Sequence, residues 1–198
     1  MGGSLTENEL LQAARRSGCE LSSFDNFIET GTYKGDTTIM ASRLFRRVYT
    51  MEIVKSLYEA SVDRANAELG RNHNISFFLN DSVKQLQRLI PTIKGSSVYF
   101  IDAHQSGPDT SNNGKCVPLM EELSVILSND IDRSLFIFDD VRFWLGKPKQ
   151  AWDWEHISDS SILEQFHTNG YEVIKHYELN DRFYVDAEKK TFAMLSID

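Results

Sequence analysis

The residues of this chain with the clearest chemical potential are acids placed where apolar, strand-like runs end. They are Glu29, Glu52, Asp81, Asp102 and the pair Asp139-Asp140. In an open parallel sheet the carboxyl ends of the strands meet at one edge, where ligands bind. Crowded carboxylates repel one another unless hydroxyls, an ammonium group or a metal ion compensates them. A turn or a helix cap explains any one of these acids, but a series at equivalent places indicates a binding edge.

The first of these acids, Glu29, stands directly before a glycine turn. The stretch FIETGTYKGDTTI contains Gly31 and Gly35, which let a ligand approach the main chain where a Cβ atom would clash. The spacing is neither G-x-G-x-x-G nor G-x-x-x-x-G-K-[ST], which argues against a pyrophosphate ligand. A carboxylate at this turn disfavours a phosphate and suits a cationic or hydroxylated ligand.

The next two acids have settings that indicate a nucleoside. Glu52 follows Gly35 by 17 residues, and an acid at such a strand end can accept both hydroxyls of a ribose. The alternative is a helix-capping glutamate. The Asp81-Ser82 pair follows the third predicted strand, where a side-chain oxygen can receive an adenine amino group. A plain helix N-cap explains Asp81 equally well.

The elements that must position these acids alternate between strand and helix. Strands are predicted over residues 26–29, 47–53, 75–80, 97–102 and 134–140. Helices are predicted over residues 5–16, 37–44, 56–69, 82–89, 119–127 and 160–168. This order predicts an α/β fold in which a parallel sheet is covered on both faces. The polar connection over residues 103–118 is long for a compact domain, and loops of that length are usually functional or mobile.

The last third of the chain has a different pattern. Apolar runs over residues 171–179, 182–186 and 191–197, with a polar turn over residues 187–190 between the last two, predict an antiparallel hairpin that closes the sheet. With 198 residues and 41% hydrophobic content, the chain predicts one domain over residues 24–198. Residues 1–23 are predicted to form a leader and a helix that flanks this domain and is able to pack on a second subunit in a homodimer.

The net charge and the cysteine content limit the classes of binding partner and the cellular compartment that we expect. The formal net charge is −8, and no lysine or arginine cluster is longer than the Arg-Arg pairs, so a nucleic-acid partner is not expected. A small molecule is favoured as the substrate. Cys19 and Cys116 are far apart and form no C-x-x-C pair, and no signal-like or membrane-spanning apolar run is present. We therefore expect a soluble, cytoplasmic protein with free thiols and no membrane partner.

Five motifs in order resemble a known family. ETGTYKG, YTMEI, LNDS, YFIDAH and FIFDD resemble the class I S-adenosylmethionine-dependent methyltransferases, from about Phe24 to the C-terminus. Within that fold the chain is similar to the small cation-dependent O-methyltransferases of the catechol type and to sugar and macrolide O-methyltransferases. The resemblance implies a Rossmann-like seven-stranded, mostly parallel sheet with helices on both faces and an antiparallel C-terminal hairpin. It also implies a transferase that uses S-adenosylmethionine to methylate a hydroxyl of a sugar, polyketide or phenol.

The resemblance assigns a role to each strand-end acid. Glu29, Gly31, Gly35 and Thr37 would line the methionine part of the cofactor, Glu52 the ribose, and Asp81 and Ser82 the adenine, with Asp102 at the same edge. Asp102, Asp139 and Asp140 would bind Mg²⁺ or another divalent cation. The catechol-type pattern has Asn at the last of these positions, and Asp keeps an oxygen ligand there.

The general base departs from the catechol-type pattern. A lysine is expected three residues after Asp102, and Gln105 stands there, which cannot accept a proton. His104 is the candidate catalytic base beside Asp102, because its ordinary pKa is near 6.5. His104 is alternatively a metal ligand, since it lies two residues after Asp102 along an extended chain, or a residue that orders the loop.

Two other functions remain open at this stage. Asp102, His104 and a second histidine would suit a metal-dependent hydroxylase, but His156, His167 and His176 are not predicted to reach the strand ends. A non-catalytic S-adenosylmethionine-binding module would use the acids only to hold the cofactor. Trp144, Trp152 and Trp154 offer flat faces for a substrate wall, and ordinary packing is the alternative for each.

Overall fold

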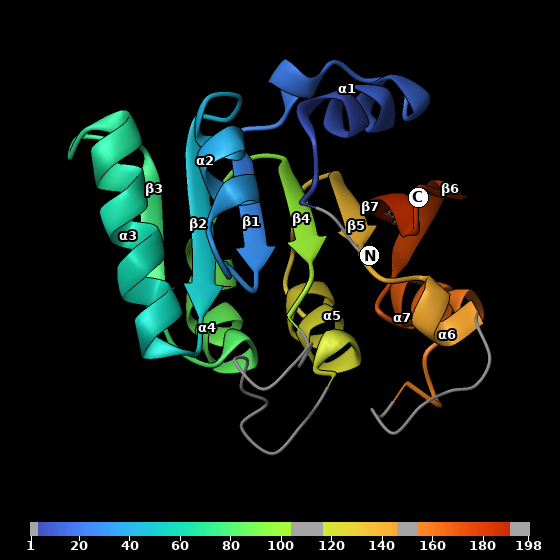
Figure 1. The fold of residues 1–198 in the computed structure, drawn as a ribbon. Helices are drawn as coiled ribbons and strands as arrows, with labels where there is room; N and C mark the ends of the chain where they lie inside the picture. The colour runs from blue at the N-terminus through green and yellow to red at the C-terminus, as the bar shows by residue number, and fades with distance from the viewer. Residues whose placement is uncertain (1–3, 104–116, 146–153, 191–198) are drawn as a thin grey trace, which may run out of the picture.

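A seven-stranded sheet forms the centre of the computed structural model, which describes residues 4–103, 117–145 and 154–190. The strand order is β3-β2-β1-β4-β5-β7-β6. The five parallel strands are β1 (Asn26–Thr30), β2 (Arg47–Glu52), β3 (Ile75–Leu79), β4 (Ser97–Ile101) and β5 (Ser134–Phe138). Figure 1 shows the arrowheads of β1, β2 and β4 pointing toward the same edge. The predicted mostly parallel α/β sheet is therefore confirmed.

Helices cover both faces of the central strands. Every residue of β1, β4 and β5 is buried, so these strands lack the alternation of polar and apolar residues that a half-exposed strand shows. The register aligns their carboxyl ends, since Glu29 in β1 lies opposite Thr50 in β2 and Phe100 in β4. The acids that follow these strands are thereby brought to one edge.

Two helical layers enclose the sheet. On one face, α1 (Glu7–Arg16), α2 (Asp36–Ser42) and α3 (Lys55–Leu69) contribute to a core shared with β1, β2 and β4, and α2 and α3 lie in front of the sheet in Figure 1. On the other face, α4 (Ser82–Leu89), α5 (Leu119–Leu127) and α7 (Asp159–Thr168) pack around a second core. The short helix α6 (Arg142–Leu145) follows β5, and 3-10 turns form over Leu21–Ser23 and Ile90–Thr92.

The C-terminal hairpin is present, but its turn lies earlier than predicted. β6 (Tyr171–Leu179) and β7 (Arg182–Lys189) are antiparallel, and β7 inserts between β5 and β6. Asn180 and Asp181 form the turn with φ angles of 53° and 64°, a left-handed conformation that these two residue types tolerate. The predicted turn over residues 187–190 is wrong, because Ala187 continues β7 and pairs with Ser134. The predicted strand over residues 191–197 lies outside the described residues.

The N-terminal helix α1 is part of the core. Leu5, Leu10, Ala13 and Ala14 are buried in the same cluster as Phe27 of β1. A capping box between Thr6 and Glu9 begins the helix. The apolar face of α1 is thus covered within the chain, and the predicted homodimer remains a prediction. Among the described residues, every helix is too short or too polar to cross a membrane.

Candidate functional site

Glu29 is a buried carboxyl group near the carboxyl end of β1. Its side chain is 2% exposed, and its Oε2 atom accepts hydrogen bonds from the hydroxyls of Thr38 and Thr50, the latter at 2.7 Å. Burial raises the pKa of Glu29 to about 7, while the two hydroxyls oppose this rise. Glu29 is therefore partly protonated near neutral pH, and a cation placed beside it would favour its charged form.

The glycine turn after Glu29 lies against the end of β4. Gly31 has a φ of +86°, and a Cβ atom added to it would lie 3.0 Å from the carbonyl oxygen of Asp102. Gly35 has a φ of +78° and precedes α2. Thr37, in the first turn of α2, is buried, and its hydroxyl accepts a hydrogen bond of 3.2 Å from the backbone N–H of Leu5. Only glycine fits the close approach at position 31.

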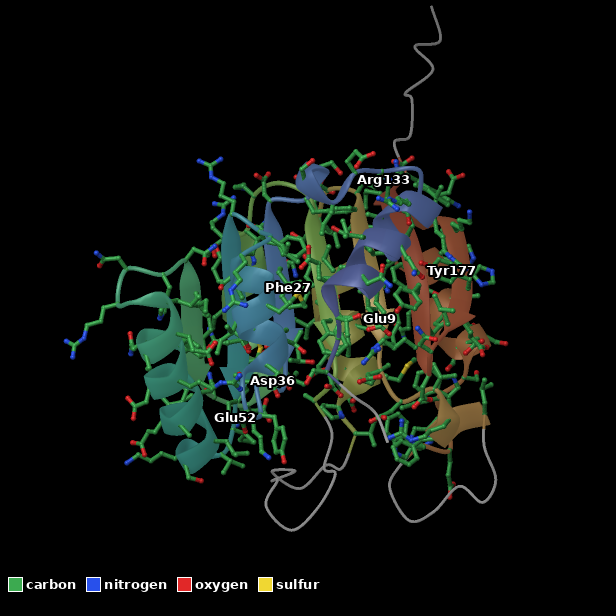
Figure 2. All side chains as sticks on the ribbon, turned by 45° about the horizontal axis from the view of Figure 1, so that its top comes forward. Glu9, Phe27, Asp36, Glu52, Arg133 and Tyr177 are labelled. Atoms are coloured by element: carbon green, nitrogen blue, oxygen red, sulfur yellow. The ribbon has the colours of Figure 1, made fainter. Side chains whose placement is uncertain are left out.

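Glu52, at the end of β2, holds two backbone segments. Its carboxylate oxygens accept hydrogen bonds from the N–H of Tyr33 at 2.9 Å and of Val54 at 2.8 Å. Figure 2 labels Glu52 near the edge toward which the strands point, whereas Arg133 lies at the opposite end of the sheet. Each carboxylate oxygen has two lone pairs, so these backbone contacts leave Glu52 able to accept further hydroxyls.

Asp81 and Ser82 form the beginning of α4. Asp81 is the N-cap residue, and its Oδ1 atom accepts a hydrogen bond of 3.0 Å from the N–H of Lys84. Ser82 is the first residue of the helix. The capping alternative for Asp81 is therefore observed, and its contact with an adenine stays a prediction.

Asp102 follows β4 and has a strongly perturbed carboxyl group. Burial, followed by the charges of Asp139, Asp140 and Glu29, raises the pKa of Asp102 well above its usual range, and Arg182 opposes this rise. The backbone N–H of Asp102 donates to the hydroxyl of Thr30 at 3.1 Å. The predicted crowding of acids at the strand ends is thus visible in the electrostatics of Asp102.

Two arginines neutralise the acids at the end of β5. Asp139 Oδ1 accepts from the N–H of Asp140 at 2.9 Å and lies 3.3 Å from Nε of Arg182. Asp140, with a φ of 65°, forms an ion pair with Arg142. Within the described residues, no three His, Cys, Asp or Glu side chains are arranged to hold a metal ion. Of the three carboxylates that were predicted to bind Mg²⁺, Asp139 and Asp140 are paired with guanidinium groups.

Other predicted residues fall outside the site or outside the described residues. His104, the candidate base, and Gln105 and Trp152 lie outside the described residues. Trp144 and Trp154 are each 5% exposed and stack on each other at 5.8 Å in the core, which favours packing over a substrate wall. The exposed residues His156, His167 and His176 join no metal-binding group in the described part of the chain.

Sequence reasoning missed Glu9, Arg182, Thr30 and Glu122. Arg182, buried at the start of β7, donates to Oε1 of Glu9 at 2.6 Å and thereby connects α1 to Asp139. Figure 2 shows Glu9 on α1 in front of the sheet. The burial of Glu122 could have been predicted from the sequence, because this residue lies three residues after Leu119 and four before Ile126, on the apolar stripe of α5. No local spacing in the sequence indicated Arg182.

Comparisons with known proteins show similarity in structure alone. No protein-family model and no curated protein matches the sequence. A Staphylococcus aureus protein described as a caffeoyl-CoA O-methyltransferase superposes with a TM-score of 0.58 and 11% identity, covering 94% of this chain and 86% of that one. Magnesium protoporphyrin IX methyltransferase from Synechocystis PCC 6803, with bound S-adenosylmethionine, gives 0.56 and 13%, covering 92% and 77%.

Methylases of other substrates have the same architecture. The ribosomal protein L11 methylase from Lactobacillus delbrueckii subsp. bulgaricus superposes with a TM-score of 0.52 and 14% identity, covering 96% of this chain and 81% of that one. At these identities the likeness establishes the fold. The chain therefore has the Rossmann-like methyltransferase fold, and its own sheet is mostly parallel with an antiparallel C-terminal hairpin.

Proposed function

We propose that the chain is an S-adenosylmethionine-dependent methyltransferase that methylates a hydroxyl group of a small molecule. The observation that carries this proposal is the buried Glu29 carboxyl beside the Gly31 turn, between β1 and β4. The strand order reverses between these two strands, and in open α/β sheets ligands bind at such a switch point. The methyltransferase fold of the chain supports this reading.

The residues at the switch point fit the cofactor. The Gly31 turn lies against the backbone of Asp102 at this edge, and Glu29 offers a carboxyl group whose charged form an ammonium would stabilise. Glu52 keeps lone pairs for ribose hydroxyls, and Asp81 and Ser82 begin α4 at the same edge. We assign Gly35 and Thr37 to the methionine side of this site. When bound, S-adenosylmethionine supplies an electrophilic methyl group on its sulfonium.

The chain's own contribution to methyl transfer is mainly positioning. The transfer is an in-line displacement, so the acceptor oxygen must be held behind the methyl group and its proton must be removed. We assign the hydroxyl to the vicinity of Asp102, whose backbone Thr30 fixes, and we keep His104 as the candidate base. A small-molecule acceptor is supported by the net charge of −8, which disfavours nucleic acid.

Metal dependence has weaker support than cofactor binding. Asp139 and Asp140 already pair with Arg182 and Arg142, so the described carboxylates do not fit a divalent cation as they are arranged. The proposed alignment of the acceptor hydroxyl and the removal of its proton require no metal ion. The catechol-type resemblance alone keeps Mg²⁺ as a prediction, and the similarity to a protein described as a caffeoyl-CoA O-methyltransferase is consistent with transfer to oxygen.

Calorimetric titration with S-adenosylmethionine and S-adenosylhomocysteine, each with Mg²⁺ and with EDTA, tests the proposal. We expect both ligands to bind, and Glu52→Gln to weaken binding about tenfold through the ribose. The control Asp36→Asn changes an exposed acid of α2 that pairs with Arg64 and should leave affinity unchanged. If neither ligand binds, with Mg²⁺ or with EDTA, the proposed function is refuted.

A screen of methyl transfer to diol-bearing sugars and phenols decides between the alternatives. Turnover that survives EDTA excludes the Mg²⁺ requirement, whereas turnover that depends on Mg²⁺ restores it. Cofactor binding without turnover on any acceptor would favour a non-catalytic binding module.

A further inference from the structure

We propose that Glu122 is a positioning residue, which holds the hydroxyl of Thr30 as a clamp on the backbone of Asp102 and Ala103. The clamp lies where the end of β1, the end of β4 and the first turn of α5 meet. Its role in catalysis rests on the proposed function, because Asp102 borders the proposed acceptor. Its existence as a structural device does not.

The hydrogen bonds of the Thr30 hydroxyl carry this inference. The hydroxyl donates to Oε2 of Glu122 at 3.2 Å and accepts from the N–H groups of Asp102 at 3.1 Å and Ala103 at 3.3 Å. A hydroxyl has one proton and two lone pairs, so these three bonds use its full capacity. Because the hydroxyl proton is directed to Glu122 in a hydrogen bond, both lone pairs of the hydroxyl oxygen are directed to the two backbone N–H groups.

The state of Glu122 indicates a role beyond stability. Its side chain is 0% exposed and lies on the apolar stripe of α5. Burial of a carboxyl group away from water destabilises the folded chain, and an apolar side chain at this position would avoid that penalty. Burial also raises the pKa of Glu122 to about 8, and the hydroxyls of Ser82 and Thr30 oppose this rise. The neutral carboxyl still accepts from Thr30.

The clamp acts on both sides of the proposed site. The carbonyl of Asp102 lies against Gly31, where an added Cβ would approach it to 3.0 Å. Fixing the backbone of Asp102 therefore also fixes the wall against which the glycine turn lies. A shift of this backbone would move the Asp102 carboxyl and the Gly31 turn together, so cofactor affinity and acceptor alignment should both respond.

Hydrogen exchange in the free protein, measured residue by residue by NMR, tests the clamp directly. In Thr30→Val, which keeps the side-chain shape, we expect the amides of Asp102 and Ala103 to exchange at least about tenfold faster. Thr30→Ser keeps the hydroxyl and should retain their protection. The control Ser97→Ala removes a buried hydroxyl at the other end of β4 and should not affect these amides. Unchanged exchange in Thr30→Val would overturn the proposal.

Substitution of Glu122 tests the second half of the clamp. Glu122→Leu leaves the Thr30 proton without its acceptor and should accelerate exchange of the same two amides, whereas Glu122→Gln retains an acceptor and should restore protection. Equal exchange in both variants would overturn the role of Glu122. If Glu122→Leu does not fold, Glu122→Met, which also lacks an oxygen acceptor and keeps the length of the side chain, takes its place in the same comparison with Glu122→Gln.

Affinity for S-adenosylhomocysteine separates this inference from the proposed function. We expect Thr30→Val to weaken its binding about tenfold and to lower turnover further, because both walls of the site shift. A wild-type protein that fails to bind the ligand refutes the proposed function, and the exchange results still decide the clamp. Faster exchange with unchanged affinity would refute the clamp's action on the site.

Discussion

Glu29 should release a proton when a ligand with an ammonium group binds beside it. Burial holds the pKa of this carboxyl at about 7, compared with an ordinary value of 4.5. A neighbouring cation favours the charged form and lowers the pKa again. If S-adenosylhomocysteine places its ammonium at Glu29, binding and deprotonation of Glu29 are linked, so binding should weaken as the pH falls below 7.

The size of the effect follows from the two pKa values. If the bound ligand returns Glu29 to 4.5, about 0.9 proton is released per ligand at pH 6 and about 0.1 at pH 8. The dissociation constant should then rise about tenfold from pH 8 to pH 6, which corresponds to about 1.4 kcal/mol. Glu29→Gln is neutral throughout this range and should show neither effect.

Calorimetry in buffers of different ionisation enthalpy measures the released protons. The amino group of the ligand titrates identically with both proteins, so the difference between wild type and Glu29→Gln isolates Glu29. Equal proton release by the two proteins at pH 6 would refute the placement of the ammonium at Glu29. Tighter binding by the wild type at pH 6 than at pH 8 would refute the linkage itself.

Three further predictions concern stability, measured by urea unfolding. Between pH 4.5 and 7, Glu29 is protonated in the folded chain and ionised in the unfolded chain, so its contribution to the free energy of unfolding is complete below pH 4.5 and is lost as the pH rises through 7. The difference in free energy of unfolding between Glu29→Gln and wild type should therefore shift by about 3 kcal/mol in favour of the variant from pH 4.5 to pH 8. A difference that does not change with pH would contradict this prediction. Gly31→Ala should cost about 3 kcal/mol or more, because its φ is +86° and an added Cβ would contact Asp102. The control Gly18→Ala has a similar φ of +70° but no atom within 4 Å of its added Cβ, so it should cost only about 1 kcal/mol, and equal losses would exclude the close approach at Gly31. Arg182→Leu leaves the buried carboxylates of Glu9 and Asp139 without their cation and should lower the free energy of unfolding by about 3–5 kcal/mol. The control Arg64→Leu removes exposed ion pairs and should lower it by about 1 kcal/mol or less. A similarly small loss for Arg182→Leu would show that the buried pairs contribute little to stability.

The fold could be predicted from the sequence because its main signals are local. A strand buried on both faces is a mainly apolar run, so β4 and β5 were recognisable within one or two residues of their bounds, and the apolar residues Phe27 and Ile28 marked β1. The hairpin turn was misplaced because residues 187–190 are polar, although the Asn180-Asp181 pair carried the stronger turn signal.

The site could be predicted in its acids but not in its cations. An acid at the end of an apolar run is visible in the sequence as a strand-end residue, and this pattern placed Glu29 and Asp139 at one edge of the predicted sheet. Arg182 reaches Glu9 across 173 residues of sequence, and no spacing rule connects two such positions. The expected metal was therefore inferred from uncompensated acids, whereas the folded chain supplies guanidinium groups to the two at the end of β5.

The contact between α1 and β7 has a consequence for synthesis of the protein. Glu9 is translated about 170 residues before Arg182, which at about 5–20 residues per second is a delay of roughly ten to thirty seconds. During this delay the apolar face of α1 can pack on β1 and β4, but the buried Glu9 carboxylate lacks its cation. The final structure is therefore secured only when the hairpin emerges, and a ribosome that stalls before Arg182 would leave a nascent chain whose N-terminal helix is a target for chaperones and proteases.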